Sequence, residues 1–370
     1  KKGVGTISQT IALDLEGKHL TLTENEISGA GLSQEDILSF SHFKSQFKRY
    51  AAALDPLMMN RPPRLKHMDR KDKFTLAKLG WSLRFGLGTE SMREFLRVGG
   101  INIYDVLNEV FESPRLKGAI AADAVLGQQM GPRTPNTVLT YLQRLWAETE
   151  GNPNLSSASE IVEVLSATAD AVGVRVSTSK RVDRIVVEKG RAIAVELETG
   201  EKISAEVIVS NTDVKSTFLH LVGSQYLDAM FCHRVHNYRC KGNVAKAFFG
   251  VSGLQAFSSL EDRQLNQRLL IAPDQRYIEH AFNHVKYGES SNNPVVEMSI
   301  PTLAEPTLAP SGYHVVSASV AYAPYEHKLG WDSQRTSFLA CVMSTIDGYA
   351  PGFSDSVEVC ALLTPFDIEE

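Results

Sequence analysis

Four residues between positions 232 and 240 have side chains that bind metal ions. The segment reads Cys232-His233-x2-His236-x3-Cys240, and thiolates with imidazoles form the ligand set that zinc prefers. The spacing matches none of the common closed zinc sites, however. We therefore interpret these residues as ordinary helix and strand positions and predict no metal site.

A histidine pair raises the same question. His280 and His284 lie one helical turn apart, as paired metal ligands on a helix do. No Glu follows His280, so the HExxH metalloprotease motif is absent, and a solvated helix face is the favoured interpretation. The sequence also contains no Gly-x-Ser-x-Gly elbow, so hydrolysis has no support.

Two glycines near the start could belong to a phosphate-binding loop. Gly3-x-Gly5 supplies the first two positions of a dinucleotide fingerprint. That fingerprint needs a buried strand before the glycines and a helix after them, because the pyrophosphate rests on the helix N-terminus. Neither pattern is present, so we predict no phosphate site here.

The clearest structural pattern runs from Arg181 to Asp213. Three β-branched runs separated by Lys189-Gly190 and Thr199-Gly200 predict a three-stranded antiparallel meander. Its strands are expected at Val182–Val187, Ile193–Leu197 and Ile203–Val209. The third run stops on Ser-Asn-Thr-Asp, and small polar residues past the carboxyl end of a strand are where open α/β sheets place ligands.

A helix is expected directly before this meander. Ser156–Ser159 supply N-cap candidates, apolar residues recur at helical spacing from Ile161 to Val172, and Gly173 closes the last turn. Helix, meander and polar strand end are therefore expected to form one unit.

These motifs resemble a known family. A helix ending in AVGVRV, a V-x-x-I strand, a glycine-turn hairpin and a strand ending in VSNTD are similar to the second nucleotide-binding segment of FAD-dependent oxidoreductases related to phytoene dehydrogenase. Further segments resemble one branch, the pyridine nucleotide-disulfide oxidoreductase domain-containing protein 2 group, and occur in the same order. They are LDPLMMNRPPRL (54–65), VFESPRLKGAIAADAVLG (110–127), GPRTPNTVL (131–139), IPTLAEPTLAPSGYHVVS (300–317), YAPGFSDSV (349–357) and LTPFDIE (363–369).

The resemblance implies an FAD cofactor and three contact residues. The backbone N–H and C=O of Val182 would meet the adenine end, and Asn211 and Thr212 would lie close to the dinucleotide. Two alternatives stay open: Val182 is equally well a core strand residue, and Asn at a strand end often serves a turn. No catalytic residue is identified, which agrees with chemistry performed by the flavin while the protein orients the reactants.

The chain also departs from the family pattern. Relatives begin with a strand and a G-x-G-x-x-G helix, end with a second glycine-rich flavin segment, and carry a Gly-Gly-Met-Gly turn where NPNLSSASE stands here. Backbone amides at helix N-termini supply most of the anion-binding power of such sites. We therefore expect a middle portion of a larger flavoprotein that by itself binds FAD weakly or not at all.

Composition limits the partners and the compartment. The net charge is −5 without a long basic run, which argues against nucleic acid. No apolar run reaches 18 residues, which excludes an ordinary transmembrane helix. Four cysteines without a dense framework fit a reducing compartment, and no signal-peptide core follows Lys1-Lys2-Gly3. We expect a soluble cytoplasmic protein, or a mitochondrial matrix protein if the source is eukaryotic; oligomeric state is not indicated.

Away from the meander, hydrophobic periodicity predicts further elements. A hairpin is expected at Ile11–Thr23. Ser33-x-x-Asp36 has the pattern of a capped helix start and should begin a helix that carries an aromatic stripe. Other helices are expected at Leu76–Leu87, Met92–Arg97, Ile103–Phe111, Arg115–Leu126, Val138–Glu148, Thr217–Val222, Arg276–Tyr287 and Asp332–Tyr349, with Asp332 as N-cap, and other strands at Ala245–Val251, Val295–Ile300 and Val315–Tyr322.

The predicted fold class is α/β plus α+β, with a partial FAD/NAD(P)-binding (Rossmann-like) domain and a mixed sheet-and-helix substrate domain. The expected divisions are 1–150, a hairpin with a helical cap; 151–216, part of the FAD-binding domain; 217–330, the α+β substrate domain; and 331–370, a closing helix that leads back toward the FAD-binding domain.

The predicted function is hydride transfer from an apolar small molecule to FAD, as in phytoene dehydrogenase-like, amine oxidase-like flavoproteins. The alternative is a non-catalytic binding or scaffold protein that keeps the fold without functional flavin. A carotenoid desaturase in the strict sense is a weaker third hypothesis, because the chain resembles another branch more closely.

Overall fold

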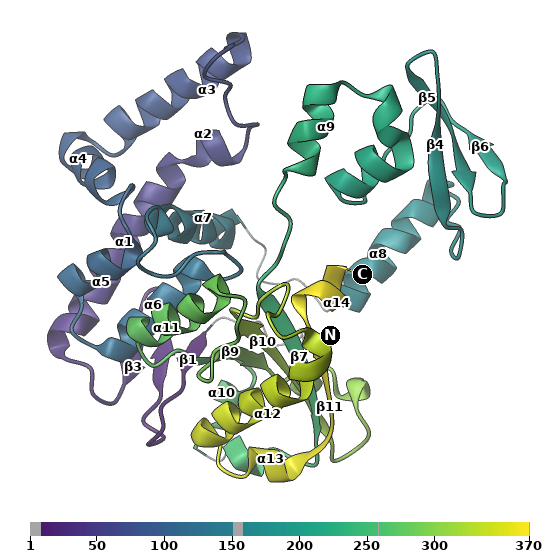
Figure 1. The fold of residues 1–370 in the computed structure, drawn as a ribbon. Helices are drawn as coiled ribbons and strands as arrows, with labels where there is room; N and C mark the ends of the chain where they lie inside the picture. Colours follow the sequence, from purple (N-terminus) through teal and green to yellow (C-terminus); the bar gives the residue numbers. More distant parts are fainter. Residues whose placement is uncertain (1–8, 151–157, 258, 370) are drawn as a thin grey trace. The chain divides into compact units, whose positions relative to one another are not determined.

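The structure, a computed structural model, describes residues 9–150, 158–257 and 259–369. The chain divides into two compact units (Figure 1). Unit 1 consists of Lys1–Ser156 and Lys241–Glu370, and unit 2 of Ser157–Cys240. Unit 2 is thus an insertion in the sequence of unit 1. Gly3 and Gly5 lie outside the described residues.

Unit 1 is built on an eight-stranded sheet with the order β11-β7-β10-β9-β8-β1-β2-β3. The pair β1 and β8 is parallel and the other pairs are antiparallel. The strands are β1 (Thr10–Ala12), β2 (Leu20–Leu22), β3 (Ile27–Gly29), β7 (Val244–Val251), β8 (Arg268–Ile271), β9 (Val295–Ser299), β10 (His314–Ala321) and β11 (Val357–Leu363). The predicted hairpin is confirmed as β1 and β2; β3, β8 and β11 were not predicted.

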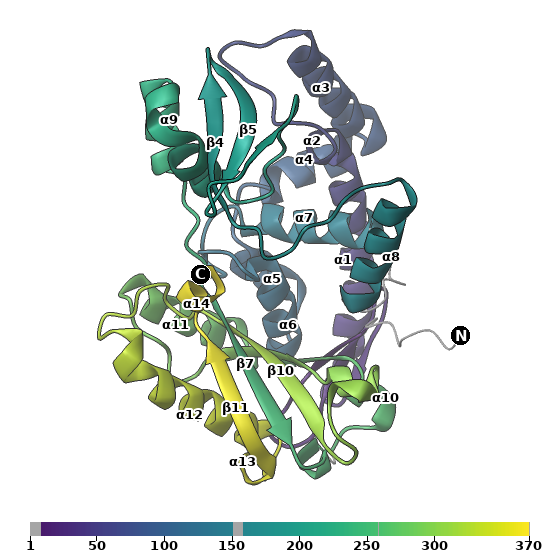
Figure 2. The same ribbon diagram turned by 90° about the vertical axis from the view of Figure 1, so that its right-hand side faces the viewer.

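Alternation along the strands divides the residues of the sheet between its two faces. Ala245, Ala247 and Phe249 of β7 are buried in one hydrophobic core, which they share with buried residues of α12 (Trp331–Tyr349) and α13 (Phe353–Ser356), two helices beside the sheet in Figure 2. A second core lies on the other face and includes α6 (Pro114–Val125) and α11 (Gln275–Lys286). Alternate residues of a strand face opposite sides of the sheet. Helices therefore pack against both faces of the sheet and cover its apolar side chains.

The second core continues into a helical layer. Its members are α1 (Gln34–Ala53), α2 (Asp55–Met58), α3 (Arg70–Trp81), a π-helical turn at Ser82–Gly86, α4 (Thr89–Val98), α5 (Ile103–Val110) and α7 (Thr137–Glu150). Ser33 caps α1 as predicted, because its hydroxyl accepts the amide of Asp36 at 3.0 Å. The predicted aromatic stripe of α1 is buried, including Phe43 and Tyr50.

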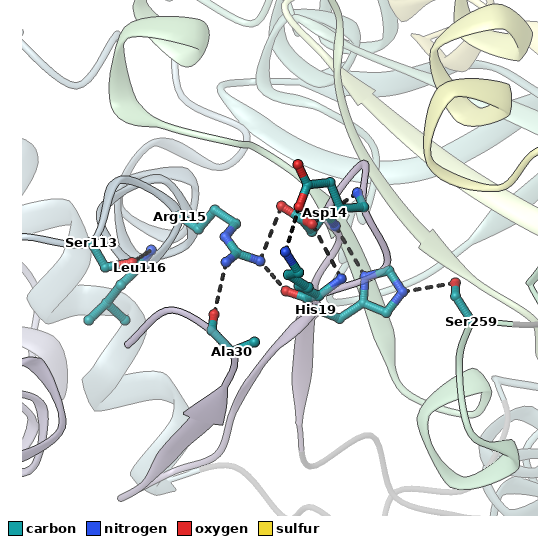
Figure 3. A network of polar contacts seen from close by, with 9 residues as sticks. Asp14, His19, Ala30, Ser113, Arg115, Leu116 and Ser259 are labelled. Carbon is teal, nitrogen blue, oxygen red and sulfur yellow. Dashed lines mark hydrogen bonds and ion pairs between the residues drawn. The ribbon is translucent and has the colours of Figure 1, made fainter. Parts of the chain in front are cut away.

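A polar network ties the first hairpin to the N-terminal turn of α6 (Figure 3). Arg115 donates to the carbonyl oxygens of Ala30, at 2.9 Å, and of Lys18, and its Nη1 lies 3.2 Å from Asp14 Oδ2. His19 contacts the Ser259 hydroxyl through Nε2 at 2.9 Å, and burial lowers the pKa of its imidazole. One arginine thus holds the open end of the β2–β3 hairpin, where Leu20 pairs with Gly29, against the helical layer.

The remaining short segments of unit 1 lie between its strands or follow the last one. They are a 3-10 turn at Gln255–Phe257, α10 (Asp262–Leu265), 3-10 turns at Pro301–Leu303 and Pro306–Leu308, and α14 (Pro365–Glu369). One detail of the prediction was wrong: Gly330, with a φ of 78°, precedes α12 at the cap position, and Asp332 lies inside the first turn. The carboxylate still favours the positive end of the helix dipole.

Unit 2 contains the predicted helix and meander. It comprises α8 (Ala158–Ala171), β4 (Val182–Glu188), β5 (Arg191–Leu197), β6 (Lys202–Ser204), a π-helix at Ser216–Gly223, a 3-10 turn at Ser224–Tyr226 and α9 (Ala229–His236). Gly173, at φ 79°, follows α8 as the predicted C-terminal glycine.

The third strand is shorter than predicted. The run Ile203–Val209 was expected to be a strand throughout, but β6 ends at Ser204. A β-strand needs a neighbour for its backbone groups, and β5 pairs with β6 only through Lys202–Ser204. Val207 and Val209 consequently stay 77% and 85% exposed, and Ser210 follows a segment outside the sheet rather than a strand end.

Candidate functional site

A cluster of three hydroxyl groups lies at the predicted cofactor position of unit 2. Ser210 Oγ is 3.1 Å from Thr212 Oγ1 and 2.8 Å from Thr217 Oγ1, and the two threonine hydroxyls are 2.8 Å apart. All three are partly or fully exposed. Hydroxyls both donate and accept, so the cluster can hold a polar uncharged ligand group at several angles.

Asp213 shapes the loop that carries this cluster. Its Oδ1 accepts the amides of Lys215 at 2.8 Å and Ser216 at 3.0 Å, which begins the π-helix and brings Thr217 back to Ser210. Hydrogen bonds from Ser216, with its hydroxyl contributing most, lower the pKa of the Asp213 carboxyl. An ionised carboxylate therefore already occupies the first free amides of this helix.

The hydroxyls border a hollow of about 340 Å³. Its other lining residues are apolar and come from the meander, the segment outside the sheet and the π-helix: Ile185, Ala192, Ile208, Val214, Phe218 and Val222. An apolar wall with a few converging polar groups is the composition of small-molecule sites. No lining residue carries a positive charge, so the hollow suits the adenosine part of a dinucleotide better than its phosphates.

The predicted FAD contacts are distributed unevenly around the hollow. Thr212 lines it, together with Ser210 of the same predicted polar run and with Thr217, which was not singled out from the sequence. Asn211 is exposed beside the cluster, outside the lining. Val182 is the half-buried first residue of β4 and pairs with Leu197. Because β4 is an edge strand of its sheet, one side of its backbone has no strand neighbour within unit 2 and can meet a planar base.

Unit 1 contains a second polar constellation that the sequence analysis missed. Arg268 of β8 is 7% exposed and donates to Asp123 Oδ1 at 2.6 Å and Glu297 Oε2 at 2.8 Å. Burial lowers the pKa of Arg268, but the two carboxylates outweigh it and hold the pKa above its ordinary value. The pKa of the Asp123 carboxyl lies below its ordinary value, because the attraction of Arg268 and Arg144 outweighs the effect of burial, so Arg268 and Asp123 are both charged at neutral pH.

A lysine lies on the same sheet face. Lys246 of β7 is directly opposite Ser319 of β10 and donates to its hydroxyl at 2.6 Å. Ser319, Arg268 and Glu297 line a cavity of about 20 Å³ that is otherwise mostly apolar, enough for about one water molecule. A lysine inside the apolar run VAKAFFGV was the signal for this site, since such a residue is seldom buried without a partner.

The metal-binding residue types stay dispersed. Cys232 and His233 lie on α9 and Cys240 follows it, while His284 has Glu289 as its neighbour at 3.9 Å. Among the described residues, no three His, Cys, Asp or Glu side chains gather in a metal-binding arrangement. No helix in the described ranges combines the length and apolar character needed to cross a membrane.

Comparison with known proteins gives two sequence relatives and one structural neighbour, although no protein-family model matches the chain. Over 99% of its length the chain is 30% identical to pyridine nucleotide-disulfide oxidoreductase domain-containing protein 2 of Rattus norvegicus. A neurosporene-forming phytoene desaturase of Cereibacter sphaeroides is 21% identical over 57% of the chain and 40% of that protein. Putrescine oxidase bound to putrescine matches 97% of the chain and 67% of its own, at 10% identity and a TM-score of 0.50.

The structural match supports a shared fold, and the sequence match supports the family. The chain spans about two thirds of the curated relatives it matches first, 66% of the rat protein. The predicted mixed α/β fold class is confirmed by the mixed sheet and by the likeness to putrescine oxidase. By its sequence, the chain belongs to the phytoene dehydrogenase-like FAD-dependent oxidoreductases, in the group of pyridine nucleotide-disulfide oxidoreductase domain-containing protein 2.

Proposed function

We propose that the protein transfers a hydride from an apolar small molecule to FAD. The observation that carries this proposal is the 30% identity, along 99% of the chain, to a member of the oxidoreductase group named above. FAD, when bound, supplies the electron acceptor for hydride chemistry. The chain itself has to hold the cofactor, position the substrate and keep water out.

Unit 2 is proposed to hold the adenosine end of FAD. The open edge of β4 at Val182 offers backbone groups to the adenine, and Asn211 and Thr212 are proposed to lie along the ribose. The support is chemical: Ser210, Thr212 and Thr217 present donors and acceptors beside an apolar hollow. Asp213 repels phosphate from this loop, so the pyrophosphate has to be held by other groups.

Unit 1 is proposed to provide the substrate surface. The sheet face at Lys246 and Ser319 adjoins apolar side chains of β8, β9 and β10 such as Leu270 and Val295. Apolar lining with one or two fixed polar groups favours an apolar substrate with a single polar anchor.

The proposed compartment is the cytoplasm, or the mitochondrial matrix of a eukaryote. The four cysteines are free thiols in the structure. Free thiols on a chain without disulfides are typical of reducing compartments.

The first test is the flavin content of the full-length protein. We expect visible flavin absorbance near one FAD per chain, followed by peroxide release or dye reduction with apolar candidate substrates. Thr212→Val should weaken FAD binding by roughly 2- to 13-fold, the range for loss of one hydrogen bond. Thr168→Val, which removes a hydroxyl bonded to Val164 O on α8, should leave FAD binding unchanged.

A second function is favoured by the chemistry of the hollow. The absence of cationic groups from its lining is compatible with a non-catalytic binding or scaffold protein. If the full-length protein is purified without flavin and does not bind added FAD, the non-catalytic function is the correct one.

A further inference from the structure

Three exposed aromatic side chains lie along one face of α3 and the π-helical turn after it. Phe74 is 72% exposed, Trp81 67% and Phe85 62%, and the Trp81 and Phe85 ring centroids are 4.3 Å apart. Spacings of seven and four residues place the three on one side of a helix. Met59, Leu65 and Met68, just before α3, are also exposed.

The opposite face of α3 is already packed. Asp72 and Thr75 are buried, and Leu79 packs against the core of the helical layer. The capping box between Asp69 and Asp72 fixes the start of the helix. The helix is therefore held in place while its aromatic face remains uncovered within unit 1.

The same segment carries a strong positive charge. Residues 61–86 contain eight Lys or Arg and two Asp, a net charge of +6 in a chain of net charge −5. Both aspartates are paired with Arg61 and Arg64. Among the described residues, no carboxylate forms an ion pair with the other six cations: Lys66, Arg70, Lys71, Lys73, Lys78 and Arg84.

Exposed aromatic rings beside cations without ion-pair partners in the described chain favour a partner that is both apolar and anionic. We propose that the basic-aromatic surface, formed by these six cations with Phe74, Trp81 and Phe85, docks the protein on an anionic phospholipid bilayer. Aromatic rings enter the headgroup boundary, while long cationic side chains reach the lipid phosphates. The proposal is independent of the reaction that the protein catalyses.

Two other occupants fit less well. A second copy would bring two surfaces of the same charge together across a twofold axis, which is repulsive. An acidic protein would satisfy the cations, but a convex helix gives it no pocket for three aromatic rings. A bilayer accepts a convex amphipathic helix without a shaped pocket. In both views α3 lies at the end of unit 1 remote from the sheet (Figures 1 and 2), so docking leaves the sheet face free.

Vesicle sedimentation of the full-length protein tests the proposal. We expect binding to phosphatidylcholine vesicles that contain phosphatidylglycerol, weaker binding to pure phosphatidylcholine, and a decrease with added salt. The double substitution Lys71→Gln/Lys78→Gln should weaken binding about 20- to 30-fold, since one cation near an anionic bilayer contributes about 1 kcal/mol, or about fivefold. The pair Lys286→Gln/Tyr287→Ser, which alters an exposed cation and an exposed aromatic elsewhere on unit 1, should bind like the wild type.

Tryptophan fluorescence gives a second readout. Of the three tryptophans, Trp81 is exposed, Trp146 is half-buried and Trp331 is 9% exposed, so vesicles should shift only the Trp81 emission to the blue. Trp81→Phe should remove the shift and keep most of the binding. Circular dichroism checks that each variant is folded.

Two results would overturn the proposal. One is a wild type that ignores anionic vesicles, or binds them no better than folded Lys71→Gln/Lys78→Gln. The other is a dimer in solution that the same substitutions dissociate, because the surface would then be covered by a second copy.

Discussion

The buried arginine of β8 offers the sharpest test of what stabilises unit 1. Arg268 joins strand β8, helix α6 and strand β9 through Asp123 and Glu297, with Thr10 Oγ1 at 3.2 Å as a further acceptor. Arg268→Met keeps the aliphatic volume of the side chain and removes its charge. Both carboxylates then lose their main counterion.

The expected loss is large. Removing one partner of a buried ion pair costs about 3–5 kcal/mol. Asp123 and Glu297 are 21% and 28% exposed, and Arg144 remains 3.4 Å from Asp123, so we expect the lower end, about 3 kcal/mol. For a urea slope of about 3 kcal/mol/M, the unfolding midpoint falls by about 1 M.

The pH dependence has a definite sign. Burial raises the pKa of Asp123, but the attraction of Arg268 and Arg144 outweighs it and leaves the pKa below 3.8. In the wild type, the stability that ionised Asp123 contributes is present above pH 3.8 and is lost as pH falls through the lowered pKa of the folded state. Without Arg268 we expect the pKa of Asp123 to rise above the unfolded value, so acid stabilises the variant relative to pH 7. The difference in free energy of unfolding between the wild type and Arg268→Met should therefore become smaller as pH falls.

Urea unfolding followed by tryptophan fluorescence is the assay, because Trp81, Trp146 and Trp331 all lie in unit 1. Arg263→Met is the matched control: its ion pair with Glu261 is equally short, 2.6 Å, but its side chain is 82% exposed. It should leave the midpoint unchanged.

The reasoning also predicts a rescue. Replacing all three charges, as Arg268→Met/Asp123→Leu/Glu297→Met, should recover most of the lost stability, because neither carboxylate is then left without its arginine partner. The explanation by a buried ion pair is refuted if Arg268→Met lowers the stability no more than Arg263→Met does. It is also refuted if the triple variant is less stable than Arg268→Met alone.

Three further predictions concern unit 1. Asp367→Asn removes a carboxylate whose pKa is held well below its ordinary value, first by hydrogen bonding from Arg335; it should cost roughly 1.5–3 kcal/mol at pH 7. In urea titrations at decreasing pH, that difference should persist down to pH 3.8 and disappear as pH falls through the lowered folded pKa. Gly118→Ala should destabilise the protein by about 1–3 kcal/mol, because a Cβ there overlaps a backbone carbonyl oxygen in the loop after β8. Gly80→Ala has open space around it and should stabilise α3 by about 0.8–1 kcal/mol. Equal shifts of the thermal unfolding midpoint in the two variants would contradict this contrast. Ser33→Ala removes the α1 cap and should cost about 0.5–2 kcal/mol in the same assay, and a Ser33→Thr variant close to wild type would attribute that loss to the hydroxyl.

Local patterns predicted the elements that local interactions determine. The α1 stripe, the Ser33 cap and the Gly173 helix end depend on residues a few positions apart, and all three were predicted from the sequence. The parallel pairing of β1 with β8 joins Thr10 to Arg268. No periodicity in either three- or four-residue strand specifies such a distant partner.

The candidate site was predicted in part for the same reason. The polar run after the meander was found, and Thr212 lies at the hollow. Thr217 was missed because the Asp213 turn brings it to Ser210, and Arg268 was missed because its two carboxylates come from α6 and β9. The third strand was predicted too long because alternation shows which side chains could face a core, but not whether a neighbouring strand exists.

The insertion of unit 2 has a consequence during synthesis on the ribosome. Strand β1 leaves the ribosome before its neighbour β8, which begins at Arg268, 258 residues after Thr10. At about 5–20 residues per second, the wait is roughly 13–52 seconds. Meanwhile the meander, whose pairings are short-range, can fold first. The nascent ribbon of β1, β2 and β3 has to be kept from pairing with other chains until the later strands leave the tunnel.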